Sequence, residues 1–132
     1  MRNDQLISIK SSKQAFHELR PFFDRDVEEL WALALNSKKQ MISIERIFRG
    51  TVDACFFHPR DIFRFAIKNN ASTIIVAHNH PSNDPTPSEA DIFLTKQLVL
   101  AGELLQIPVI DHLVITQSRH ISLVQKLSVP SK

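Results

Sequence analysis

The hydrophobic positions of the chain fall into short blocks whose spacing changes from one block to the next. Residues 29–35 (Glu-Leu-Trp-Ala-Leu-Ala-Leu) form a compact apolar run after one glutamate, which is typical of a buried strand. Residues 41–48 alternate between apolar and polar positions, and the polar turn at 36–39 predicts that the two strands form a hairpin. The β-branched and apolar residues 73–77 predict a central strand.

Helical patterns lie between these strands. Residues 12–20 follow serines that can cap a short helix, and Pro21 ends it. Pro59 suits a first helical position and predicts a helix to about residue 69. Residues 86–89 (Thr-Pro-Ser-Glu) combine a capping box with a proline at the first helical position, which predicts a helix running to about Leu105.

The remaining segments predict further extended pieces at 51–57, 107–116 and 120–124. Strands and helices therefore mix along the chain, with hairpins near both ends, and the pattern predicts an α/β domain with a mixed sheet flanked by helices. No internal repeat, low-complexity tract or linker interrupts the pattern. We expect a single domain over residues 1–132.

Composition narrows the functional classes. The single cysteine, Cys55, excludes an intramolecular disulfide framework and a CxxC zinc site. No apolar run approaches the ~18 residues of a membrane-spanning helix, so no membrane association is expected. The N-terminal residues lack the pattern of a secretory signal. These features together favour a cytoplasmic location.

The net charge of +2 is a mild excess, and the Lys and Arg residues are scattered along the chain. Proteins that bind nucleic acid usually concentrate positive charge on one face or helix. Composition therefore gives nucleic-acid binding only weak support.

Two histidines and an aspartate carry the candidate chemistry. His78 and His80 are two residues apart at the end of a predicted strand, so their side chains leave the same face within reach of one cation. Asp91 lies on the following predicted helix, three residues after Ser88, and the two share a helical face. Two imidazoles and one carboxylate suit Zn²⁺ and leave a fourth position for water, which is typical of catalytic zinc sites.

The segment from His78 to Asp91 reads His-x-His, seven residues, Ser, two residues, Asp, which resembles the JAMM metalloprotease motif without a gap. The string His-Asn-His-Pro-Ser at 78–82 resembles the RadC-like JAB domain in particular, as do Arg-Gly-Thr at 49–51 and Asp-His-Leu-Val-Ile at 111–115. The resemblance extends from about residue 28 to residue 124. It implies a JAB/MPN-like fold of the cytidine-deaminase-like type.

The resemblance also implies a role for each site residue. His78, His80 and Asp91 would hold Zn²⁺, and Ser88 would donate a hydrogen bond to the water or the oxyanion. Glu29, at the start of an apolar run, looks like the general base of the family, although Glu28 is adjacent and only one of the two can face the metal. The implied reaction is hydrolysis of a peptide or isopeptide bond in a peptide or protein substrate.

One position departs from the pattern of the RadC-like branch. Asn83 stands where that branch usually has glycine. Because asparagine tolerates a left-handed backbone better than most residues, we expect the loop to form nevertheless.

Each site residue also has a simpler structural interpretation. Ser88 could be a first-turn helix residue, Asp91 could favour the positive end of the helix dipole, and Glu29 could be a solvated charge at a strand edge. His112, beside Asp111, could support the sheet or line the cleft.

Two other functional classes stay open at this point. RadC proteins carry an inherited DNA-repair label, which predicts a DNA-associated factor, and some MPN relatives are non-catalytic scaffolds. Two neighbouring zinc chemistries are excluded, because the chain has neither the HExxH of zincins nor the HxE and PCxxC pattern of nucleobase deaminases.

Overall fold

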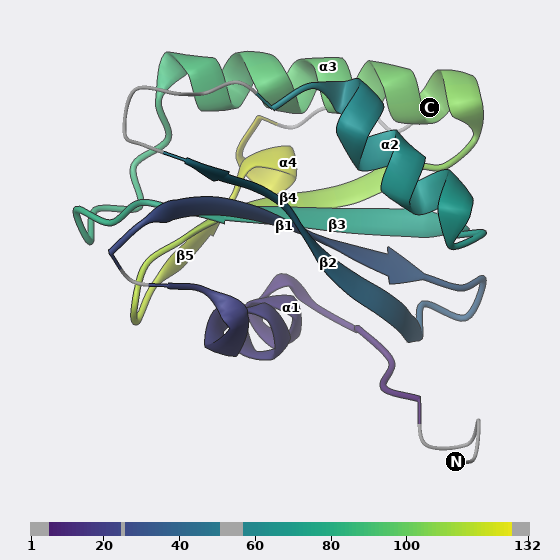
Figure 1. The fold of residues 1–132 in the computed structure, drawn as a ribbon, viewed down its shortest axis with the longest axis horizontal. Helices are drawn as coiled ribbons and strands as arrows, with labels where there is room; N and C mark the ends of the chain where they lie inside the picture. The colour runs from purple at the N-terminus through teal and green to yellow at the C-terminus, as the bar shows by residue number, and fades with distance from the viewer. Residues whose placement is uncertain (1–5, 25, 51–56, 128–132) are drawn as a thin grey trace.

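A mixed β-sheet forms the centre of the molecule. The computed structural model describes residues 6–24, 26–50 and 57–127. Five strands pair in the order β2-β1-β3-β4-β5 (Figure 1). Their bounds are β1 Glu28–Leu35, β2 Met41–Gly50, β3 Thr73–Asn79, β4 Val109–Ile115 and β5 His120–Ser122. The predicted α/β fold with a mixed sheet is therefore confirmed.

The two central strands β3 and β4 are the only parallel pair in the sheet of the described residues. Strand β1 runs antiparallel to both β2 and β3, and β5 runs antiparallel to β4. A parallel pair needs a crossover, and α3 (Glu89–Leu105) supplies it. The carboxyl ends of β3 and β4 consequently lie at the same edge of the sheet, where α/β proteins commonly place their sites.

Helices cover both faces of the sheet (Figure 1). Helix α1 (Ser12–Leu19) packs on one face and continues into a 3₁₀ turn at Arg20–Phe22. Helices α2 (Pro59–Lys68) and α3 pack on the other face. Strands β1, β3 and β4 are thus buried on both sides by two separate apolar clusters, whereas β2 is only partly buried.

This double burial explains the continuous apolar run of β1. Leu30, Ala32 and Ala34 join the cluster under α2 and α3, whereas Leu33 and Leu35 join the cluster under α1. Both faces of β1 need apolar side chains, so apolar and polar residues do not alternate along it. The sequence therefore does not show which residues share a face.

The start of α3 differs from the prediction. The carboxylate of Asp84 accepts hydrogen bonds from the backbone N–H and the hydroxyl of Thr86, so Thr86 belongs to the preceding loop and does not cap the helix. Ser88 is the N-cap, and its capping-box partner is Asp91 in place of Glu89. The helix therefore begins two residues later than a helix with proline at its first position would.

The C-terminal part of the chain also differs. The predicted strand at 120–124 ends at Ser122, and a short helix α4 (Leu123–Leu127) follows it. Residues 51–56, which include Cys55 and most of one predicted extended piece, lie outside the described residues. Among the described residues, no helix has both the length and the apolar character needed to cross a bilayer.

Helix α3 allows a matched test of this packing. Leu98 is fully buried in the cluster under α2 and α3, whereas Leu104 on the same helix is 82% exposed. We expect Leu98→Ala to lower the free energy of unfolding by about 2–5 kcal/mol, because it leaves a cavity in the core. We expect Leu104→Ala to change it by less than about 0.5 kcal/mol. Urea denaturation measures both, and similar losses in the two variants would contradict this assignment of the buried face.

Candidate metal centre

The candidate site forms where β3 ends. His78 is fully buried on the face covered by α2 and α3, and His80 follows the strand at 18% side-chain exposure. Asn79, between them, points to the opposite face. Its side-chain Oδ1 accepts a hydrogen bond of 2.7 Å from the Glu29 N–H, and its Nδ2 donates to the carbonyls of Asp24 and Val27 at 3.0 Å each. Asn79 therefore ties the start of β1 to the end of β3.

Asp91 contacts both imidazoles from the first turn of α3. Its Oδ1 lies 2.8 Å from His78 Nε2, and its Oδ2 lies 3.1 Å from His80 Nε2. The Ser88 N–H donates to Oδ2 at 2.8 Å. Burial raises the pKa of the Asp91 carboxyl, but the two imidazoles and this N–H outweigh it and hold the pKa well below its usual range. The structure thus brings together all three predicted zinc ligands.

Glu28 joins this cluster from the start of β1. Ligand atoms of Glu28, His78 and His80 all lie within 4.8 Å of one another, and this is the only such group of potential metal ligands among the described residues. The residue is 8% exposed, and burial raises the pKa of its carboxyl. Of the two adjacent glutamates, Glu28 is therefore the one whose carboxyl group lies beside the histidines.

The expectation that Glu29 faces the histidines is wrong. Its carboxylate points to the other side of the sheet, where it accepts hydrogen bonds from Arg49 and from the indole of Trp31 at 2.9 Å. The reason is the register of the strands, in which Leu30 pairs with His78 and Glu29 pairs with Arg49. Side chains alternate along β1, so Glu28 shares the face of Leu30 and Glu29 does not.

Ser88 has a structural role that accounts for its contacts. Its Oγ accepts a hydrogen bond of 3.1 Å from the Asp91 N–H, and its own N–H is bonded to the Asp91 carboxylate, which completes a capping box. Ser88 is exposed, so its hydroxyl proton can still be donated to another group.

The loop after β3 orients the second histidine. His80 Nδ1 lies 3.0 Å from the carbonyl of Asp84, which leaves Nε2 facing Asp91. The Asn83 N–H donates to the His80 carbonyl at 3.0 Å, and Asn83 has φ of 71°. The expectation that asparagine supports a left-handed position here is confirmed.

The donor set fits a metal ion. His78 Nε2 is buried and makes no hydrogen bond with the described residues, although Asp91 Oδ1 is only 2.8 Å away. A buried nitrogen without a hydrogen bond is costly unless it binds another group. Two imidazoles and a carboxylate are the ligands that zinc prefers at a site open to water.

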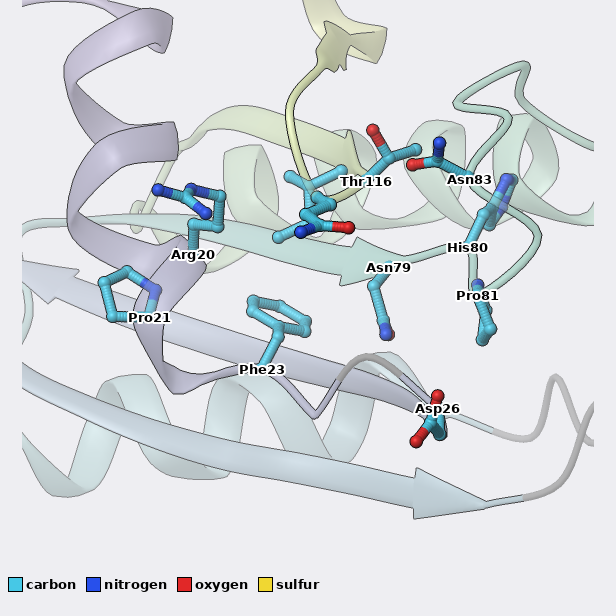
Figure 2. Close-up of a pocket in the computed structure, with 11 residues that line it drawn as sticks. Arg20, Pro21, Phe23, Asp26, Asn79, His80, Pro81, Asn83 and Thr116 are labelled. Atoms are coloured by element: carbon cyan, nitrogen blue, oxygen red, sulfur yellow. The ribbon is translucent and has the colours of Figure 1, made fainter.

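A cleft of about 660 Å³ opens beside the site, at the carboxyl ends of β3 and β4 (Figure 2). It reaches the site at His80 and extends between the 3₁₀ turn that follows α1 and the loop after β4. Residues of different character line it, among them Arg20, Phe23, Asp26 and Thr116. The partly exposed His80 therefore connects the buried cluster to a space large enough for a ligand.

A family model described as the RadC-like JAB domain matches residues 9–128. The chain belongs to this family. The match begins before residue 28, so α1 is part of the RadC-like domain, and the resemblance seen in the sequence underestimated its extent.

Curated relatives agree with the family. A "UPF0758 protein" of Desulforamulus reducens is 47% identical over 103 residues, which cover 78% of this chain and 45% of the relative. Another from Desulforudis audaxviator is 44% identical, covering 77% of this chain and 44% of the relative. A third from Caldanaerobacter subterraneus subsp. tengcongensis is 48% identical, covering 75% and 42%. The chain thus spans less than half the length of these relatives, and their shared name states no activity.

The two neighbouring glutamates allow a test of the facing assignment in the metal-free protein. Glu29→Gln removes a buried charge from Arg49, so we expect a loss of about 1–3 kcal/mol in the free energy of unfolding. Glu28→Gln removes a desolvated carboxylate, so we expect a change within about 0.5 kcal/mol or a gain in stability. Urea denaturation after chelation distinguishes the two, and the reverse order would contradict the orientation of β1.

Proposed function

We propose that this RadC-like JAB domain is a zinc-dependent hydrolase of peptide or isopeptide bonds, with Glu28 as the general base. The observation that carries the proposal is the group of Glu28, His78 and the partly exposed His80, with Asp91 in contact with both imidazoles. Glu28 replaces Glu29 in this role because only Glu28 lies on the face of the histidines.

The contacts distinguish ligands from base. His78, His80 and Asp91 are the residues that would hold Zn²⁺, since the Asp91 oxygens face both Nε2 atoms and the capping box fixes its carboxylate. Glu28 has no hydrogen-bond partner among the described residues, so its carboxylate is free to exchange a proton. Zinc in such a site supplies Lewis acidity and lowers the pKa of water toward neutrality.

The protein side chains then have distinct tasks. Glu28 accepts the proton of the attacking water and returns it to the leaving nitrogen, which allows the C–N bond to break. The exposed Ser88 hydroxyl donates a hydrogen bond to the oxyanion that develops on the carbonyl oxygen. This role of Ser88 is compatible with its place as N-cap, because the cap uses its lone pair and leaves its proton available.

The cleft beside His80 supports a peptide substrate. It is open, it carries both charged and apolar side chains, and His80 is among the residues that line it. An extended peptide could lie in it with one carbonyl near His80.

Bound metal is the first test. We expect about one zinc ion per chain in the wild type by inductively coupled plasma mass spectrometry, and less than about a tenth of that in His78→Ala/His80→Ala. His17→Ala is the matched control, because His17 is exposed on α1 and distant in the fold from the site. A wild type without zinc after reconstitution at neutral pH would overturn the proposal.

Activity tests the role of Glu28. We expect Glu28→Gln to keep its zinc and to lower kcat/KM by about 10²–10⁴-fold, which is the usual contribution of a general base. The readout is cleavage of a peptide library that includes isopeptide-linked members. Glu29→Gln should retain kcat/KM within about tenfold where it stays folded, since its contacts lie on the other face. A larger loss in Glu29→Gln than in Glu28→Gln would contradict the assignment of the base.

A further inference from the structure

A buried chain of polar side chains begins at Nδ1 of His78 and leads through His112 to Thr95. His78 Nδ1 lies 3.0 Å from His112 Nε2, and His112 Nδ1 lies 2.5 Å from the hydroxyl of Thr95. All three residues are fully buried. His112 comes from β4 and Thr95 from α3, so the chain links the strand that carries His78 with the helix that carries Asp91.

The protons of this chain can be arranged in two ways. A hydroxyl has one proton, and Thr95 either donates it to the Asp91 carbonyl at 2.8 Å or to His112 Nδ1. In the first arrangement His112 Nδ1–H donates to Thr95, His112 Nε2 accepts, and His78 carries its proton on Nδ1. In the second arrangement Thr95 donates to His112 Nδ1, His112 Nε2–H donates to His78 Nδ1, and His78 carries its proton on Nε2.

The surroundings of His78 Nε2 distinguish the two arrangements. His78 Nε2 lies 2.8 Å from Asp91 Oδ1 but forms no hydrogen bond with it, so a proton on Nε2 would be buried without an acceptor among the described residues. An unprotonated Nε2 and a carboxylate oxygen that both face one point are instead arranged as ligands of a cation. Only the first arrangement leaves Nε2 with its lone pair free.

We propose that His112 and Thr95 are positioning residues that hold His78 in the tautomer with Nδ1 protonated, so that its Nε2 lone pair faces the metal position. This inference rests on the proposed metal site. His112 is not itself a ligand, because both its nitrogens are engaged within the chain. Hydrogen bonds of this kind to the second nitrogen of a histidine ligand fix its tautomer and its ring orientation.

Thr95 offers matched variants. Thr95→Val keeps the shape of the side chain and removes the hydroxyl, whereas Thr95→Ser keeps the hydroxyl. His112→Leu removes the acceptor for His78 Nδ1–H, and His112→Gln supplies a carbonyl acceptor. If Thr95 and His112 only filled space, the valine and leucine variants would not be worse than the serine and glutamine variants. Valine and leucine pack at least as well as serine and glutamine in a buried position.

The first readout is the tautomer of His78 in the metal-free protein, measured by ¹⁵N-resolved NMR of histidine side chains at about pH 8, where ordinary histidines are neutral. We expect the Nδ1–H form in the wild type, in Thr95→Ser and in His112→Gln, and a mixture of the two tautomers in Thr95→Val and in His112→Leu. A wild type in the Nε2–H form would overturn the inference, whether or not the protein binds zinc.

The second readout is zinc affinity, measured by competition with a chromophoric chelator. We expect a loss of about 10- to 100-fold in Thr95→Val and His112→Leu, and near wild-type affinity in the two conservative variants. Equal affinity in all four variants would overturn the inference while leaving the proposed hydrolase intact. If His112→Leu does not fold, Thr95→Val still decides, because it changes the volume of the side chain very little.

Discussion

The pairing of β1 with β3 places Leu30 opposite His78, and the chemistry of the site depends on this register. Side chains alternate on both strands, so a shift of β1 by one residue would turn Glu28 away from the histidines and Glu29 toward them. Asn79 holds the register at the edge of the sheet, since its side chain bonds the backbone on both sides of the start of β1. Its amide thereby fixes both the strand and the glutamate that the strand carries.

Burial of so many polar groups in a small domain requires that they satisfy one another. The Asp111 carboxylate accepts hydrogen bonds from Ser12 on α1, from Ser122 on β5 and from the His112 N–H. It therefore connects the outer elements to the strand beneath the site. The pKa of His112 is lowered well below its usual value by its complete burial, so its imidazole is neutral and can take part in the chain of hydrogen bonds behind His78.

Glu28 differs from these buried polar groups in how its carboxyl group is bonded. Within the part of the chain that the structure describes, it has no ion pair like the one between its neighbour Glu29 and Arg49, and burial raises the pKa of its carboxyl. Active sites commonly keep such groups at the expense of stability, because a carboxylate that is fully paired cannot exchange protons. Among the described residues, the two adjacent glutamates thus differ: Glu29 pairs with Arg49, and Glu28 lies beside the imidazoles without an ion pair.

The sequence by itself determined the α/β class, the two histidines, the aspartate and the family, because these depend on local spacing and on residue types that few other sites combine. The family match confirmed the family, and the sheet of the structure confirmed the class. The sequence could not decide whether Glu28 or Glu29 faces the histidines. Residues 30–35 are apolar on both faces of the strand, so they show no alternation that assigns each residue to a face. The N-cap of α3 was also predicted at the wrong residue. Thr86 donates its N–H and its hydroxyl to Asp84, and residue types alone do not show that it prefers this partner to capping the helix. His112 lies 34 residues from His78, and only the parallel pairing of β3 with β4 brings their rings together. Local patterns specify elements and motifs, whereas facing and proximity follow from strand register, which is a property of the assembled sheet.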